Sequence, residues 1–187
     1  SYNVFSFSSG SNIHVSGIHF DLSGLAGGNT WQGCGIYMGA CSASSVKDCF
    51  FYNGKRQGVV FQNTTDSEVS GNSVYNSSVD PAETDQADFN IISNNIIKKV
   101  RGSIYNVAAG NYSFGAGIYL QGASNCSVMG NFIEDTNVST DTSDTLAPGA
   151  IGLTNLTECS IVGNIIEAPK RYGIAIFNPL QKGPVDG

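Results

Sequence analysis

The stretch Asn125-Cys126-Ser127-Val128-Met129-Gly130-Asn131-Phe132-Ile133 decides the fold of this chain. Its apolar residues Val128 and Ile133 lie five positions apart, with the turn-forming pair Gly130-Asn131 between them. The five-residue offset recurs in the pairs Val15/Phe20, Val46/Phe51, Val69/Val74, Ile92/Ile97, Val128/Ile133 and Ile161/Ile166. Repetition with fixed internal offsets is typical of a solenoid, in which each unit buries its apolar side against its neighbours.

A further strand is expected in every unit, starting ten positions before Val15 and its equivalents. Apolar-x-apolar segments occupy residues 5–7, 36–38, 59–61, 118–120 and 151–153, and residues 174–176 start a seventh unit. Only the fourth unit, with Ala82 and Thr84, departs from the rule. Period-two alternation predicts short strands with one inward face, and the Asn, Gly, Ser and Asp between them suit turns. The sequence therefore predicts an all-β, single-stranded parallel β-helix of about six to seven coils.

The recurring Asn/Asp-x-x-Val-x-Gly-Asn-x-Ile pattern resembles the right-handed parallel β-helix of the pectate-lyase-like superfamily over residues 4–177. That superfamily includes polysaccharide lyases, polygalacturonases, alginate epimerases and phage tailspikes. The resemblance implies a right-handed helix and an extracellular protein (secreted, cell-surface or virion) with a polysaccharide partner. Because one fold hosts many functions, the reaction must be argued from the site.

Length and composition limit the number of domains and the classes of partner that this chain can have. The 187 residues suit one β-helix domain over 1–187. A net charge of −6 disfavours nucleic acid, and no apolar run approaches the ~20 residues of a membrane span. The chain starts and stops inside a coil, so we expect uncapped ends and either a fragment of a longer chain or capping by partner chains. A homotrimer and an end-to-end assembly both fit such ends.

Two outward columns on the first strand of each coil are the expected place for the chemistry. One column is predicted to contain Ser6, Tyr37, Val60, Glu83, Tyr119, Gly152 and Ala175, and the next Ser8, Gly39, Gln62, Asp85, Gln121, Thr154 and Phe177. Neighbours in a column lie one rung, ~4.8 Å, apart. Glu83 and Asp85 should therefore stand among tyrosine rings and glutamine amides, which suit sugar rings and hydroxyls.

Three long insertions, at residues 21–35, 98–117 and 134–149, leave the same corner of the predicted helix. Long loops on a rigid scaffold often carry binding residues. We therefore expect a trough walled by the Trp31 loop and the Tyr105/Tyr112 loop. Its floor is predicted to contain Tyr52, Lys55, Arg56, Tyr75 and Asp80. The predicted polysaccharide-binding residues are Trp31, Tyr37, Lys55, Arg56, Gln62, Arg101, Tyr105, Tyr112, Tyr119 and Gln121.

Asp80, Glu83 and Asp85 are the predicted catalytic residues. Carboxylates two residues apart on a strand lie ~6.5–7 Å apart at Cβ, so side-chain reach permits both glycosidase geometries. One acid would protonate the leaving oxygen while the other attacks or activates water. Glu83-Thr84-Asp85 is similar to the Asn-Thr-Asp of polygalacturonases, and residues 80–83 resemble the Asp-Pro-His-Asp of alginate epimerases with Ala82 in place of histidine.

Several alternatives stay open at this point. The later paired-Asp, Gly-His-Gly and Arg-x-Lys motifs of polygalacturonases are absent, and a lyase could use Lys55, Arg56 or Lys98 as its base. A non-catalytic glycan-binding adhesin, a structural rod or filament subunit, and a merely solvated acidic loop at residues 80–88 are the other hypotheses. No metal site and no cofactor are expected, apart from a calcium ion that Asp80, Glu83, Asp85 and Asp88 could hold.

The remaining repeated positions predict structural roles. Asn72, Asn95, Asn131 and Asn164 share one turn position and should form a ladder of stacked amides, with Cys49 at the same place in the second coil. Cys126 and Cys159 should stack as buried thiols in adjacent coils. His14 and His19 alternate with apolar residues and should point outward.

Overall fold

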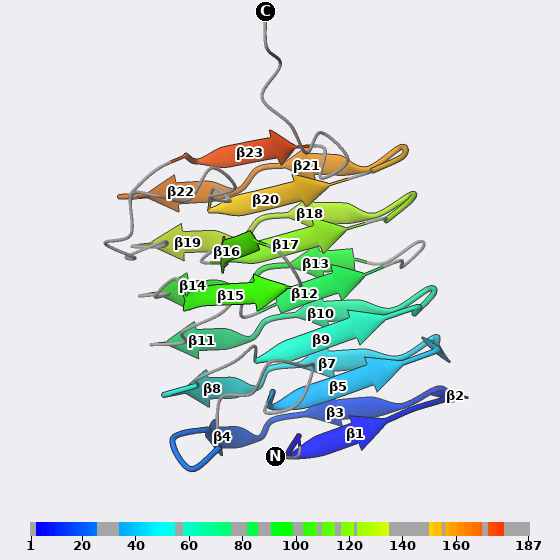
Figure 1. The fold of residues 1–187 in the computed structure, drawn as a ribbon. Helices are drawn as coiled ribbons and strands as arrows, with labels where there is room; N and C mark the ends of the chain where they lie inside the picture. Colours follow the sequence, from blue (N-terminus) through cyan, green and yellow to red (C-terminus); the bar gives the residue numbers. More distant parts are fainter. Residues whose placement is uncertain are drawn as a thin grey trace, which may run out of the picture.

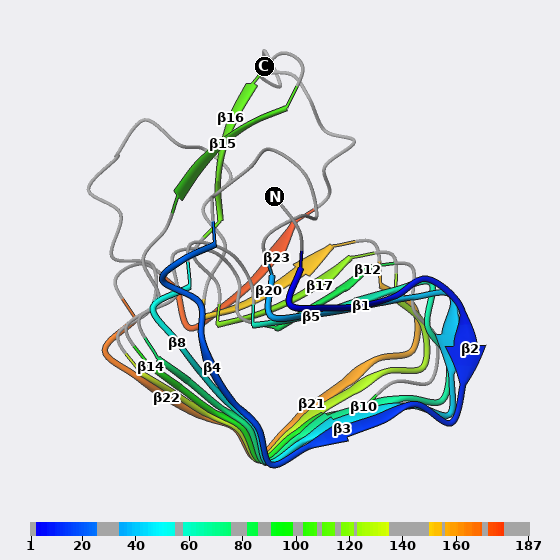
Figure 2. The same ribbon diagram turned by 90° about the horizontal axis from the view of Figure 1, so that it is seen from below.

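A computed structural model of the chain describes residues 3–25, 34–54, 58–75, 82–85, 91–98, 103–107, 110–114, 117–121, 123–134, 150–154, 156–169 and 172–177. Every regular element in these ranges is a β-strand, and the strands stack into one elongated helix (Figure 1). Seen along its axis, the stack has three flat sides that enclose the core (Figure 2). The described residues thus contain no helix that could span a membrane.

Three parallel sheets form the sides. The first sheet contains β1 (Phe5–Phe7), β5 (Ile36–Gly39), β9 (Val59–Gln62), β12 (Ala82–Asp85), β17 (Ile118–Gln121), β20 (Ile151–Thr154) and β23 (Ile174–Phe177). The second contains β3 (His14–Ser16), β7 (Ser45–Lys47), β10 (Glu68–Ser70), β13 (Ile91–Ser93), β18 (Ser127–Met129) and β21 (Ser160–Val162). The third contains β4 (His19–Asp21), β8 (Phe50–Tyr52), β11 (Ser73–Tyr75), β14 (Ile96–Lys98), β19 (Phe132–Glu134) and β22 (Ile165–Glu167).

One strand from each sheet makes a coil, so that coil 1 is β1-β3-β4 and coil 6 is β20-β21-β22, while β23 starts a seventh. Two shorter pairs complete the fold. These are the parallel pair β2 (Gly10–Ser11) and β6 (Cys41–Ser42), and the antiparallel pair β15 (Ser103–Val107) and β16 (Gly110–Phe114). The predicted all-β parallel β-helix with about six to seven coils is confirmed.

The backbone register agrees with the register predicted from the sequence. In the first sheet Glu83 pairs with Val60 on one side and Tyr119 on the other, and Asp85 pairs with Gln62 and Gln121. The weakly apolar segment at Ala82–Asp85 nevertheless forms strand β12, because strands on both sides supply parallel backbone partners for it.

Inward apolar side chains fill the helix as stacks that run along its axis. Phe20 and Phe51 lie face to face with ring centroids 4.7 Å apart and planes tilted by 3°. Phe5 meets Phe20 edge to face at 5.7 Å. Aromatic pairs of this kind add to the stabilisation from apolar burial, so the core orders each coil directly on its neighbour.

The sharp vertex between the second and third sheets explains the Gly-Asn motif. Its first turn residue has a positive φ in every coil, at Gly17, Asp48, Gly71, Asn94, Gly130 and Gly163. Glycine, asparagine and aspartate tolerate this left-handed conformation best. The next residue turns inward, and there Asn72, Asn95 and Asn131 are buried.

The predicted amide ladder is present at this vertex. The Asn95 amide nitrogen donates to Asn131 Oδ1 at 3.0 Å and to the Val69 carbonyl at 3.0 Å, while Asn95 Oδ1 accepts from the backbone and side-chain nitrogens of Asn72. Asn131 and Asn164 repeat the pattern. Cys49 takes the expected place, and its backbone nitrogen donates to Asn72 Oδ1 at 2.9 Å.

A second ladder lines the corner between the first and second sheets. Ser44 and Ser67 donate their hydroxyls to backbone carbonyls two residues earlier, and the thiols of Cys126 and Cys159 occupy the same position. The backbone nitrogen of Cys126 donates to Cys159 Sγ at 3.4 Å. This contact confirms the predicted stack of Cys126 on Cys159, and all five cysteines are free thiols; the predicted burial holds for Cys126, whereas Cys159 is half-buried. His14 and His19 are exposed, as predicted.

The coil nearest the C-terminus of the described stack leaves apolar residues in solvent. Ile176 is 82% exposed. A hollow of about 460 Å³ opens beside it, lined by Leu153, Leu156, Glu158, Cys159, Ile161 and Ile176.

Candidate functional site

The outward columns of the first sheet are the first part of the candidate site. The register places Glu83 between Val60 and Tyr119, and Asp85 between Gln62 and Gln121. The side chains of Glu83, Asp85 and Gln121 lie outside the described part of the structure. Their expected roles therefore stay predictions, now on a confirmed backbone register.

Tyr37 and Gln62 are the two predicted binding residues that the structure brings into contact. The Tyr37 hydroxyl donates to Gln62 Oε1 at 2.6 Å, across one rung of the first sheet. Gly39 makes room for this contact, since a Cβ there would lie 2.6 Å from the Tyr37 hydroxyl oxygen. Both side chains are half-buried, so this bond fixes a phenol and an amide at the surface of the sheet.

The prediction that Tyr119 presents its ring at the surface for stacking is wrong. Its side chain is only 3% exposed, and that of Val60, two rungs away in the same column, is 0% exposed. Neither residue belongs to the inner core cluster that contains the flanking Ile118, Leu120, Val59 and Phe61. The outer face of the first sheet is therefore covered at these two positions, and Tyr119 does not present an open stacking surface.

Other predicted residues fall outside the described ranges or are described only by their backbone. Trp31, Lys55, Arg56, Asp80 and Arg101 lie outside the described residues. The segment expected to be the Tyr105/Tyr112 loop contains the hairpin β15–β16, in which Tyr105 is paired directly opposite Tyr112. The β-branched and aromatic residues Ile104, Tyr105 and Val107 are a sequence signal that could have indicated a strand here. The side chains of both tyrosines are not described.

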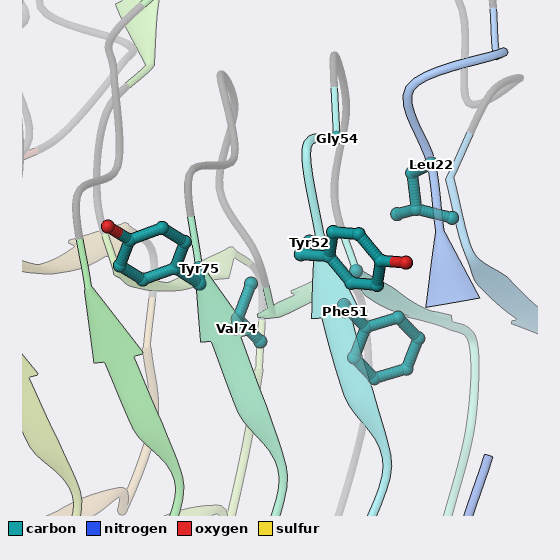
Figure 3. Close-up of a pocket in the computed structure, with 7 residues that line it drawn as sticks. Leu22, Phe51, Tyr52, Gly54, Val74 and Tyr75 are labelled. Atoms are coloured by element: carbon teal, nitrogen blue, oxygen red, sulfur yellow. The ribbon is translucent and has the colours of Figure 1, made fainter. Parts of the chain in front are cut away.

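The outer edge of the third sheet is the second part of the candidate site. Tyr52 and Tyr75 are the last residues of β8 and β11 and pair in register, one rung apart. Figure 3 shows their rings on neighbouring strands with the hydroxyl groups pointing away from each other. Tyr75 is 38% exposed and Tyr52 is half-buried. They border a shallow hollow lined by Leu22, Phe51, Tyr52, Gly54, Gly58, Val74 and Tyr75.

We call Tyr52, Tyr75 and the two rings beside them, Phe50 and His19, the aromatic edge. Phe50 lies 5.5 Å from Tyr52 between ring centroids, and His19 lies 5.5 Å from Phe50. Phe50 is half-buried and His19 is exposed. The outer face of the third sheet therefore carries four rings within its first three coils, which is a surface suited to the apolar faces of sugars.

Asp21 adds a carboxylate beside these rings, since it is the register partner of Tyr52. The backbone N–H of Ser23 donates to Asp21 Oδ1 at 3.0 Å. This bond, followed by side-chain bonds from Ser23 and Asn53, lowers the pKa of Asp21. The ionised group can accept hydrogen bonds from hydroxyls. Sequence reasoning missed Asp21, although it precedes Tyr52 and Tyr75 in the column six positions after Val15, Val46 and Val69.

A metal centre is not evident among the side chains that the structure describes. No group of three or more His, Cys, Asp or Glu residues there could hold a metal ion. The calcium ion considered at Asp80, Glu83, Asp85 and Asp88 is not tested by this observation, because those side chains lie outside the described part.

Comparison with known proteins adds one match. The family model described as "Right handed beta helix region" matches residues 1–111, which is more than half of the 187 residues. A search of curated proteins found no match.

Proposed function

We propose that this chain, which belongs to the right-handed β-helix family, binds an extracellular polysaccharide at the corner between its third and first sheets. The observation that carries the proposal is the pair Tyr52 and Tyr75, partly exposed on adjacent rungs, with Asp21 in the same column. Rings ~4.8 Å apart along a strand-paired column offer a continuous apolar strip, and carboxylates and amides beside such a strip accept and donate to sugar hydroxyls.

The contacts on the first sheet support the same surface. The bond between Tyr37 and Gln62 holds both polar groups in fixed positions. Preorganised polar groups lower the cost of ordering a flexible ligand. A glycan that crosses the corner would meet Tyr52 on β8 and then the first sheet, where β9 with Gln62 follows β8 in the chain and β5 with Tyr37 lies one rung away.

Cleavage of the bound glycan is the finer part of the proposal. Glu83 and Asp85 would act as the acid and its partner, with Asp80 as a third carboxylate close by in sequence. Like charges on two neighbouring carboxylates raise the pKa of one of them, which would divide the roles of proton donor and of base or nucleophile. Hydrolysis and elimination are both compatible with this arrangement.

The test has a binding arm and a cleavage arm. A panel of neutral and acidic polysaccharides is incubated with the chain, and both reducing ends and the ultraviolet absorbance of unsaturated products are measured. Reducing ends alone indicate a hydrolase, and both signals indicate a lyase. Glu83→Gln and Asp85→Asn should abolish either signal while binding persists. Cleavage that survives both substitutions would place the chemistry elsewhere.

Binding is measured by affinity electrophoresis in gels that contain each polysaccharide. Tyr52→Ala and Tyr75→Ala should each weaken retardation by about tenfold, since stacked aromatic rings often dominate such sites. Tyr172→Ala is the matched control. Tyr172 is 61% exposed and precedes β23 in the sequence, several coils away from β8. Equal retardation of all three variants and the wild type would reject the aromatic edge as the glycan site.

A non-catalytic adhesin is the second candidate function. It is favoured by the described contacts, because the Tyr37–Gln62 bond and the Tyr52/Tyr75 pair provide the hydrogen bonding and stacking that binding alone requires. In that case the wild type is retarded in the gels, the tyrosine variants lose retardation, and neither product signal appears with any polysaccharide.

A further inference from the structure

The vertex between the second and third sheets changes its surface character halfway along the helix. Beside this vertex, coils 4–6 place five apolar side chains outward: Met129 and Val162 on the second sheet, and Ile96, Phe132 and Ile165 on the third. We call these five residues the apolar ridge. The same two columns in coils 1–3 contain Ser16, Lys47 and Ser70, and His19, Phe50 and Ser73.

The ridge is exposed although its neighbours in sequence fill the core. Val162 is 63% exposed, Ile165 54%, Ile96 46% and Met129 39%, and Phe132 is half-buried, whereas Val128, Ile133 and Ile97 are buried. Together the ridge side chains present on the order of 400 Å² of apolar surface, within the range of the largest patches that monomers leave open. Outward strand positions that face water are ordinarily polar, so the ridge marks a contact surface.

We propose that the apolar ridge packs against a second copy of this chain lying alongside it with a parallel axis. A standard protein interface covers roughly 800 Å² on each partner, and somewhat more than half of that area is apolar. The ridge supplies an apolar core of that size. Hydroxyls of Ser127 and Ser160, which are linked at 2.9 Å, lie in the adjacent column and can serve as part of the polar rim.

A second copy fits this surface better than other partners for two reasons. Its own columns repeat at the same ~4.8 Å rung spacing, so side chains of the two chains can interdigitate rung by rung. The ridge also has two different flanks, one on each sheet and separated by the sharp vertex (Figure 2). The Ile96–Phe132–Ile165 flank of one copy can therefore meet the Met129–Val162 flank of the next.

The chemistry of the ridge disfavours a membrane surface as its partner. None of the five ridge residues is basic, and attraction to anionic lipids depends on lysine and arginine beside the apolar surface. The next column of the third sheet contains one lysine, Lys98, and two acids, the half-buried Glu134 and the exposed Glu167, so that it is acidic on balance.

Charged side chains in coils 1–3 determine the axial alignment of the two copies. If one copy slid along the other by three coils, the ion pair between Lys47 and Glu68, with Nζ 2.5 Å from Oε2, would face the ridge. Covering charged groups with apolar surface removes their hydration without compensation. This penalty disfavours the shifted arrangements, so that ridge meets ridge at the same height.

Sedimentation velocity across a concentration series of about 1 to 100 µM tests the proposal in the range typical of weak interfaces. The wild type should self-associate, and the double substitution Val162→Lys/Ile165→Lys should raise the dissociation constant at least about tenfold. The matched control Ser16→Lys/His19→Lys places lysines in the same two columns of coil 1 and should leave association unchanged. Ile176→Lys tests the open end of the helix separately.

Circular dichroism and thermal unfolding establish that each variant keeps the fold. Should the lysine pair fail to fold, Val162→Thr/Ile165→Thr keeps β-branched side chains at both strand positions and should still weaken association. A wild type that stays monomeric throughout the series would overturn the proposal. So would a folded ridge variant that associates like the wild type, or association that only Ile176→Lys disrupts. The proposal does not depend on glycan binding.

Discussion

In every coil the chain crosses the vertex between the second and third sheets and then the corner between the third and first sheets. The two junctions differ in how much the length of the connection varies. At the vertex, two residues separate the strands in all six coils, from 17–18 in coil 1 to 163–164 in coil 6. At the corner, the connection ranges from six residues at 53–58 to nineteen at 99–117. The vertex contains a buried hydrogen-bond ladder, whereas the corner carries the aromatic edge.

This difference separates a junction with a structural role from the junction where binding is proposed. A buried amide must find its partners in the next coil, so the vertex tolerates neither insertions nor a shifted register. The corner accommodates connections of very different length, and each added residue raises the entropic cost of closing a loop only slightly. Substitutions at the vertex should therefore reduce stability strongly, and substitutions at the corner mainly alter binding.

The largest effect is expected for Asn95→Ala. This substitution removes the amide that bonds to Asn72, Val69 and Asn131, and it leaves several buried groups without partners. The free energy of unfolding should fall by about 3 kcal/mol or more, as measured by urea denaturation. Asn164→Ala, at the half-buried end of the ladder, is the comparison and should cost clearly less. Equal losses at both positions would contradict cooperative bonding along the ladder.

The next largest loss of stability is expected for alanine substitutions of two glycines at the same vertex. Gly71 has φ +66°, and a Cβ added there would collide with the Asp48 carboxylate oxygen. Gly71→Ala should cost about 1.5 kcal/mol, mostly from backbone strain, because the colliding oxygen belongs to an exposed side chain that can rotate away. Gly17 has nearly the same φ of +68° but open space around it, so Gly17→Ala should cost only about 1 kcal/mol. If the thermal midpoints of the two variants coincide, crowding at the vertex has no influence.

The substitution Tyr75→Ala tests how much a side chain at the corner contributes to stability. Because Tyr75 is 38% exposed at the end of β11, its removal should lower the free energy of unfolding by only about 1 kcal/mol. The same variant is expected to lose glycan retardation, which separates binding from folding. A loss of stability as large as that of Asn95→Ala would show that the corner is part of the structural framework.

The smallest effect concerns pH and the ion pair on the second sheet. The hydrogen bond from Lys47, then that from Ser70, lowers the pKa of Glu68. The stabilisation is therefore present above the ordinary glutamate pKa and is lost as pH falls through the lowered value. Since both side chains are about a third exposed or more, the contribution is a few tenths of a kcal/mol. Glu68→Gln should flatten the acid side of the stability–pH curve by that amount.

The features repeated in every coil could be predicted from the sequence. The apolar spacing gave the register of Glu83 with Val60 and Tyr119, and the shared Asn position gave the ladder. Features produced by non-repeated residues could not be predicted in this way. Tyr119 occupies the predicted column, but its burial depends on what covers the sheet from outside. The apolar ridge likewise depends on residues that are not repeated, because the same two columns of the second and third sheets differ between coils 1–3 and coils 4–6.

The direction of the amide ladder has a consequence for how the rod comes apart. Each asparagine from Asn72 to Asn131 donates to the next coil toward the C-terminus, and each also accepts from the preceding coil, Asn72 from the backbone nitrogen of Cys49; Asn164 is the last member. Opening should begin by fraying at the extremities, and protection against hydrogen exchange should rise toward the middle coils. The amide protons of Asn72 and Asn95 are then expected to exchange only when several coils open together.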